Sequence, residues 1–281
     1  MNLSVIIIHA APEQKYRDVL LETIRSIRSQ EYTGEIEVIV TDDGSCWSQM
    51  LLEKDTDLQV FDGEMVQTLP ALTDLQVDAY LLARTSNRYL KAPLWNQAVA
   101  MARHDKLVFL DDDHPFTSKK ALARYSELLD RYDFVFGRII APDRTYRRFR
   151  DPSVQGTNFA MRRGLFERIK GFGEYTTEWG CGEDSDLFWK VYKVLTQVST
   201  GAKRAFFAGD IMTRDLCTGR WLGCHGGAEK CIAGFQTLHG VHPHTNPSRT
   251  KSIWVERSVA DHWFDFYARI NNYLIRHLKK I

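Results

Sequence analysis

LVFLDDD, residues 107–113, joins a short apolar run to three consecutive carboxylates. An apolar run of this kind is typical of a strand that is buried on both faces of a sheet. Buried charge without a partner is costly, so carboxylates next to such a strand need a reason to be there. A second acidic pair, Glu183-Asp184, follows Gly180-Cys181-Gly182 and leads into another apolar stretch. A bound cation, a sugar hydroxyl or a proton transfer would each account for both clusters.

Strand and helix patterns alternate along the first half of the chain. Continuous apolar runs predict strands, and apolar residues at helical spacing predict helices. The strands are expected at 4–8, 36–40, 106–110 and 134–140, and the helices at 15–30, 94–103 and 185–197. A strand, a helix and a second strand in this order form a βαβ unit, which predicts a parallel sheet in an α/β fold.

Two acidic turns, Asp42-Asp43 and Asp111 to Asp113, follow predicted strands of this sheet. Ligands of open α/β sheets bind outside the carboxyl ends of the strands. The sequence therefore predicts that both turns lie on one rim of the sheet and line one binding site.

The composition is that of an ordinary globular protein, with 281 residues, 44% of them apolar and 26% charged. The net charge of +1 gives no general attraction to nucleic acid. We expect no nucleic-acid partner, no secretory leader and no membrane-spanning segment. The expected location is the cytoplasm, with the inner face of the membrane as an alternative. Five cysteines, an odd and sparse set, argue against a disulfide framework.

The region 198–250 is less regular and is predicted to form long loops. Cys217, Cys224, His225 and Cys231 raise the alternative of a zinc site, but they lack the short C-x₂-C pair of most structural zinc sites. Reduced thiols in a loop are the favoured interpretation.

Residues 251–281 are predicted to be helical, with aromatic residues upstream of Lys279 and Lys280. Such a helix could make peripheral contact with an anionic membrane surface. Packing against the rest of the protein is the favoured alternative.

Five motifs occur in a fixed order along the chain. They are the opening strand Val5-Ile6-Ile7-Ile8, the second strand and its turn from Val38 to Ser45, Asn96-Gln97-Ala98 followed by 107–113, the segment from Gly156 to Arg163, and Gly171-Phe172-Gly173 through Gly182-Glu183-Asp184. With them the chain resembles the GT-A-fold glycosyltransferases, close to the inverting family 2, over about residues 1–245. The Gly182-Glu183-Asp184 region also resembles the carboxyl-terminal part of β-1,4-galactosyltransferases.

The resemblance implies a Rossmann-like mixed sheet flanked by helices. Residues 1–115 would form the nucleotide-sugar-binding half and 116–245 the acceptor-binding half, with 246–281 as a helical extension. The implied activity is metal-dependent, inverting transfer of a hexosyl or N-acetylhexosaminyl group. The implied partners are a nucleotide-sugar donor, for which UDP is the expected nucleotide, and a glycan or glycolipid acceptor.

The resemblance also implies a cation site for Mn²⁺ or Mg²⁺. Asp113 would coordinate the cation, and Asp111 or Asp112 would contact the cation or the ribose. Hard cations prefer such oxygen ligands. Among the late histidines His225, His239, His242 and His244, the third ligand is assigned to His242. The alternative for the acidic triplet is a solvated turn or a helix cap before Pro115.

On the donor side, Asp43 would accept a hydrogen bond from uracil, and His9 and Asn96 would lie against the nucleotide. A plain Asp-Gly turn is the alternative for Asp43. On the acceptor side, Asp184 would be the general base and Glu183 would orient the acceptor.

Trp179 would form a platform for a sugar, or pack in the core, and Asn158 belongs to the acceptor-side strand. Both Glu183 and Asp184 could instead cap the helix that follows them.

Other functions fit less well. A nucleotidyltransferase would carry a Gly-rich basic loop after the first strand, and a dinucleotide oxidoreductase would carry G-x-G-x-x-G there, whereas this chain has His9-Ala10-Ala11-Pro12-Glu13. A retaining transferase and a non-catalytic nucleotide-sugar-binding scaffold remain as alternatives.

Overall fold

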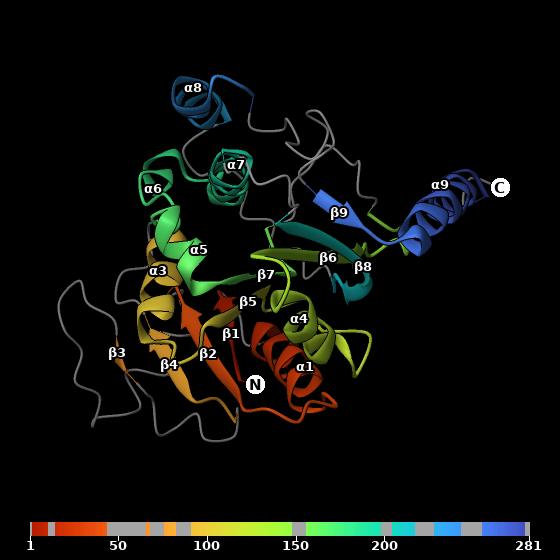
Figure 1. Ribbon diagram of the computed structural model, residues 1–281, viewed down its shortest axis with the longest axis horizontal. Coiled ribbons are helices and arrows are strands. Elements are labelled where there is room, and N and C mark those ends of the chain that lie inside the picture. The colour runs from red at the N-terminus through yellow and green to blue at the C-terminus, as the bar shows by residue number, and fades with distance from the viewer. Residues whose placement is uncertain are drawn as a thin grey trace.

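A computed structural model of the chain describes residues 2–10, 15–43, 66–67, 76–82, 91–147, 156–197, 204–216, 228–242 and 255–278. These residues form one nine-stranded mixed sheet, in the order β3-β4-β2-β1-β5-β7-β6-β8-β9, with helices on both faces (Figure 1). The strands are β1 (Leu3–His9), β2 (Ile36–Asp42), β3 (Val66–Gln67), β4 (Ala79–Leu82), β5 (Lys106–Asp111), β6 (Phe134–Ile140), β7 (Phe159–Arg162), β8 (Ala205–Arg214) and β9 (Val255–Arg257). The helices are α1 (Lys15–Arg28), α3 (Lys91–Met101), α4 (Ala121–Leu129), α5 (Arg163–Arg168), α6 (Thr176–Trp179), α7 (Glu183–Thr196), α8 (Ala228–His239) and α9 (Val259–Leu278).

The centre of the sheet follows the predicted βαβ pattern. β1 lies between β2 and β5 and is parallel to both, with His9 opposite Asp42 and Ile8 opposite Asp111. The predicted α/β class, the mixed sheet flanked by helices and the carboxyl-terminal helix are confirmed. Because β1, β2 and β5 run the same way, their carboxyl ends deliver Asp42, Asp43 and Asp111 to one rim, as predicted.

The second half makes the sheet mixed, as expected, but two of its strands were not predicted. β7 runs antiparallel between β5 and β6, and β8 and β9 then continue the sheet in parallel with β6. The region 198–250, predicted as loops, contains the ten-residue strand β8 and helix α8. β9 pairs with β8, so the segment after residue 245 contributes a strand to this same sheet as well as α9.

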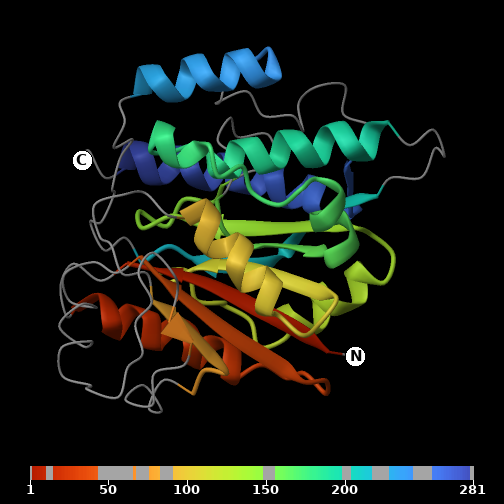
Figure 2. The ribbon, with the colours of Figure 1, turned by 90° about the vertical axis from the view of Figure 1, so that its left-hand side faces the viewer.

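Two apolar clusters cover the two faces of the sheet, and Figure 2 shows the helices that lie against it. α1 and α4 pack on one face through residues such as Leu20, Ile24 and Leu122. α3, α5 and α7 pack on the other face, where Trp95 and Phe109 meet edge to face at 5.7 Å. α8 forms a further layer over α7, as both views show.

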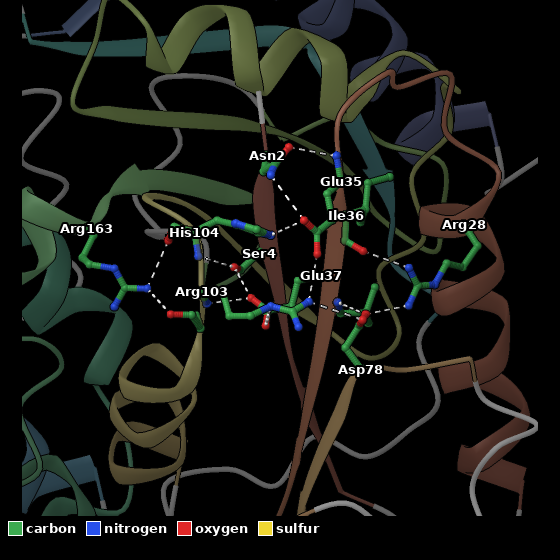
Figure 3. Close-up of polar contacts among 12 residues, drawn as sticks. Asn2, Ser4, Arg28, Glu35, Ile36, Glu37, Asp78, Arg103, His104 and Arg163 are labelled. Atoms are coloured by element: carbon green, nitrogen blue, oxygen red, sulfur yellow. Dashed lines mark hydrogen bonds and ion pairs between the residues drawn. The ribbon is translucent and has the colours of Figure 1, made fainter.

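A polar cluster fastens the amino ends of β1 and β2, opposite the acidic rim (Figure 3). The buried carboxylate of Glu37 accepts hydrogen bonds from Ser4 Oγ at 2.5 Å and from the backbone N–H of Arg103 at 2.8 Å. Arg28 donates to Ile36 O and to Asp78 Oδ2, each at 2.9 Å. All these groups have partners, so this end of the sheet serves stability.

No helix among the described residues is long and apolar enough to cross a membrane.

Candidate active site

The two acidic clusters converge on one lysine. Lys91 begins α3, and its Nζ lies 2.8 Å from Asp111 Oδ1, at the end of β5. The same Nζ lies 3.5 Å from Glu183 Oε1, in the first turn of α7, and 4.5 Å from the centre of the Trp95 ring. Segments far apart in the sequence therefore share a single ammonium group.

Electrostatics keep this lysine charged. Burial lowers the pKa of Lys91, but the carboxylates of Asp111 and Glu183 outweigh burial, so its pKa is raised. Burial also raises the pKa of Asp111, against the opposing effect of Lys91. Lys91 thus balances part of a strongly negative site.

Asp111, Asp113 and His114 form a group that could hold a metal ion. One ligand atom from each lies within 4.8 Å of the others. His114 Nδ1 is 2.7 Å from Asp113 Oδ1. Burial lowers the pKa of His114, but the hydrogen bond and charge of Asp113 outweigh burial and raise it. Asp111 and Asp113 were predicted ligands; His114, the next residue after the triplet, was not.

Asp112 points away from this group. Its carboxylate contacts Nδ1 of His9, and both side chains are buried. The backbone of Asp112 is also fixed, because its N–H donates to Ile8 O at 3.1 Å and its carbonyl accepts from Thr23 Oγ1 at 2.5 Å. The His9–Asp112 pair therefore lies beneath the rim and fastens the turn to β1.

The turn after β2 lies next to the same pair. The backbone N–H of Asp43 donates to His9 O at 3.1 Å, and the Asp43 side chain is partly exposed. Asp42, by contrast, is fully buried and accepts a hydrogen bond from Tyr80. Of the two carboxylates, Asp43 is therefore the more exposed.

Helix α7 begins at Glu183, two residues before the predicted start, and places both acidic residues in its first turn. Asp184 Oδ1 accepts the N–H of Ser185 at 2.6 Å. Burial, with the added charge of Glu183, raises the pKa of Asp184 to about 7. A carboxylate with this pKa is half protonated at neutral pH and is suited to proton transfer.

The segment Gly156-Thr157-Asn158 joins the two clusters. The N–H of Asp111 donates to Thr157 Oγ1 at 2.8 Å. A Cβ at position 156 would lie 3.1 Å from Asp184 Oδ2 and 3.5 Å from Lys91 Nζ. Glycine at 156 thus lets the chain pass close to Asp184.

The structure gives Asn158 a role different from the predicted acceptor contact. Its side chain is fully buried, accepts from Tyr125 Oη at 2.8 Å, and donates to Arg138 O and Ile211 O at 2.9 and 3.2 Å. Its φ of 57° is one that asparagine adopts more readily than most residues. Asn158 therefore fastens the sheet beneath the site.

Asn96, predicted to lie against the nucleotide, holds a loop. Its Oδ1 accepts the N–H of Phe172 at 2.8 Å, and its Nδ2 donates to Phe172 O at 3.0 Å and to Glu174 Oε1 at 2.9 Å. This pairing connects α3 to the loop that leads toward α6 and α7.

Trp179, the last residue of α6, lies against α8, and His239 is the last residue of α8. A Cβ at Gly234 of α8 would overlap the Trp179 ring, so α8 covers part of the predicted sugar platform. His239 Nε2 lies 2.8 Å from Asp186 Oδ1 and fastens α8 to α7. His242, the predicted third ligand, does not belong to the group formed by Asp111, Asp113 and His114 among the described residues.

Several residues considered in the sequence lie outside the described part of the chain. They include Ala11, Pro12, Glu13, Gly44, Ser45, Cys217, Cys224, His225, His244, Lys279 and Lys280. Cys231 is buried in α8, and its thiol is 3.7 Å from Cys181 O.

Comparison with known proteins gives no match to a family model and none to a curated protein sequence. Solved structures do match. The mannosyltransferase PcManGT from Pyrobaculum calidifontis, in complex with GDP-Man and Mn²⁺, superposes with a TM-score of 0.54 and 18% identity, over 95% of this chain and 73% of that chain. TarS 1–349 from S. aureus superposes with a TM-score of 0.51 and 17% sequence identity, over 76% of this chain and 60% of that chain. The same TarS fragment in complex with UDP-GlcNAc superposes with a TM-score of 0.50 and 16% identity.

At these identities the likeness establishes the fold. The chain has the α/β fold of nucleotide-sugar glycosyltransferases, with the mixed sheet expected for GT-A. It spans 60% of the length of the TarS fragment.

Proposed function

We propose that this protein is a metal-dependent, inverting glycosyltransferase that moves a hexosyl or N-acetylhexosaminyl group from a nucleotide sugar to a hydroxyl of a glycan or glycolipid. UDP is the proposed nucleotide. The observation that carries the proposal is the convergence of Asp111 and Glu183 on Lys91, beside the Asp113–His114 pair and next to Asp184. The fold shared with proteins whose structures were solved in complex with UDP-GlcNAc or with GDP-Man and Mn²⁺ supports it.

The donor set fits a divalent cation. Two carboxylates and one imidazole offer ligand atoms close enough to share an ion, and Mn²⁺ accepts both ligand types. A cation bound there would neutralise charge that develops on the diphosphate leaving group. Asp111, Asp113 and His114 would hold it, and Asp43 would contact the base.

Asp184 is the proposed general base. With a pKa raised to about 7, it can take the proton of the acceptor hydroxyl at neutral pH. The hydroxyl oxygen then forms a bond to the anomeric carbon as the bond from that carbon to the diphosphate breaks. Attack opposite the leaving group inverts the anomeric configuration. Glu183 orients the acceptor, and Lys91 keeps the crowded carboxylates in place.

The test is a screen of UDP-Glc, UDP-Gal, UDP-GlcNAc and GDP-Man, each with and without MnCl₂. A donor that binds the folded protein should raise its melting temperature by mass action. Nucleotide release then measures turnover, and NMR coupling constants of the product give its anomeric configuration.

A retained configuration would remove Asp184 from the role of base. Binding of donor without any release or transfer would favour a non-catalytic scaffold.

A further inference from the structure

Helix α9 turns its apolar side outward. Its exposed side chains include Trp263, Phe266, Tyr267, Ile270, Tyr273 and Leu274, of which Trp263 is 69% and Tyr273 63% exposed. Their spacing of three and four residues places them on one side of the helix. The helix lies at the β9 end of the sheet, away from β3 (Figure 1).

The inward side of α9 is largely polar. Asp265 forms ion pairs with Arg138 and Arg257, each at 2.9 Å. Asn272 exchanges two hydrogen bonds with the backbone of Tyr146, at 2.7 and 2.8 Å. These directional contacts fix the rotation of the helix, so the outward position of the aromatic side chains is built into the fold.

The acidic side chains of α9 face inward, whereas two of its basic side chains are exposed. Its acidic residues, Asp261 and Asp265, face inward: Asp261 is buried and bonded to Ser258, and Asp265 meets the two arginines. Arg269 and Arg276 are exposed and lie about two turns apart, along the same side of the helix. The exposed surface of α9 therefore has an aromatic side with two cations along one flank.

We propose that α9 docks this protein onto an anionic lipid surface, lying in the plane of the membrane. Amphipathic helices with aromatic side chains beside basic ones bind at the boundary between the lipid headgroups and the acyl chains. Trp and Tyr rings are favoured at this boundary. Anionic headgroups would neutralise Arg269 and Arg276, whereas a second copy packed through the same face would bring these like charges together. This inference does not depend on the proposed transferase activity.

The experiment is co-sedimentation of the full chain with lipid vesicles. One set is phosphatidylcholine alone and the other contains about 30% phosphatidylglycerol, which supplies negative charge. We expect the chain to pellet with the anionic vesicles, to pellet less with neutral ones, and to be released by added salt.

Two variants separate the apolar and ionic parts. The double substitution Trp263→Ser/Phe266→Ser should lower partitioning into anionic vesicles by about tenfold or more. Arg269→Gln/Arg276→Gln should weaken binding to anionic vesicles and remove the preference for them. Leu238→Ser is the matched control, because Leu238 is an exposed apolar residue on α8, and it should bind like the parent chain.

Three results would each overturn the proposal. The first is equal pelleting of the parent chain and the Trp263→Ser/Phe266→Ser variant with anionic vesicles. The second is equal binding of the parent chain to neutral and anionic vesicles. The third is a dimer in light scattering that this variant dissociates, without lipid binding by the parent chain. Because the substituted side chains are exposed, circular dichroism should show unchanged folding.

Discussion

Lys91 Nζ lies 2.8 Å from Asp111 Oδ1, and this contact brings the start of α3 against the end of β5. The same ammonium faces Glu183 from α7. α3, β5 and α7 thus meet at the ammonium group of Lys91. Its positive charge offsets the repulsion between the carboxylates, which would otherwise oppose folding.

Replacing Lys91 by methionine should destabilise the protein. It would leave Asp111 and Glu183 without their shared cation, and loss of one partner of a buried pair costs about 3–5 kcal/mol. Because Lys91 is partly reachable by water, we expect the lower part of that range. Urea denaturation at pH 8 measures it. Lys91→Arg, which keeps the charge, is the control, and a methionine variant as stable as the parent would show that the carboxylates do not need the cation.

Transfer activity should rise with pH through about 7. Asp184 acts as a base only when ionised, and its pKa is raised to about 7, so activity is low below that pH and levels off above it. Asp184→Asn should lower the rate by about 10²–10⁴ and leave donor binding unchanged. Glu178→Gln, at an exposed position on α6, is the matched control. Wild-type transfer by Asp184→Asn would refute the base assignment.

Asp184→Asn should also change how the free energy of unfolding depends on pH. A pKa raised on folding means that the fold disfavours the carboxylate: the stability due to Asp184 is complete below its unfolded pKa, near 3.9, and is lost as pH rises through about 7. Asp184→Asn stays neutral, so it should melt higher than the parent at pH 8 and equally at pH 4. Each kcal/mol corresponds to about 2–4 °C. A lower melting temperature at pH 8 would contradict a raised pKa.

Removing either proposed metal ligand should weaken binding of Mn²⁺. Asp113→Asn and His114→Gln should each raise the dissociation constant about tenfold or more, because each removes one donor. Electron paramagnetic resonance of free Mn²⁺ measures this directly. His104→Gln, in the polar cluster at the opposite end of the sheet, should bind like the parent chain (Figure 3). Unchanged affinity in the Asp113 and His114 variants would place the cation elsewhere.

Asn158→Ala should act on stability and leave acceptor binding unchanged. The substitution removes the three hydrogen bonds that Asn158 makes with the Tyr125 hydroxyl and two backbone carbonyls, and each buried loss costs about 1–3 kcal/mol. Urea denaturation gives the loss, and the acceptor KM of the folded fraction should equal that of the parent. If Asn158→Ala left the free energy of unfolding unchanged and raised the KM for the acceptor, the predicted acceptor contact of Asn158 would be supported instead.

The centre of the sheet could be predicted from the sequence because each of the strands β1, β2, β5 and β6 contains a run of at least three apolar residues. β1, β2, β5 and β6 cover the predicted segments, and the acidic turns follow from strand direction alone. β9 could not be predicted in this way: it has three residues, and its partner β8 lies in a region whose periodicity is weak.

Some residues of the candidate site could be predicted from local sequence, and others could not because they join the site only through packing. The acidic clusters are visible as local sequence, whereas Lys91 becomes part of the site only when α3, β5 and α7 pack together. His114 had a local signal, since it follows the acidic triplet directly. Asn158 matched a motif, but its burial and left-handed backbone depend on Tyr125, Arg138 and Ile211, which no local pattern contains.

Within the described residues, the sheet ends in its two shortest members, β3 with two residues and β9 with three. A long edge strand exposes unpaired backbone N–H and C=O groups, with which a neighbouring chain can pair, and so promotes fibril growth. Short edge strands expose few such groups. At the concentrations reached in purification, the chain should therefore resist fibril growth through main-chain pairing at either of these strands.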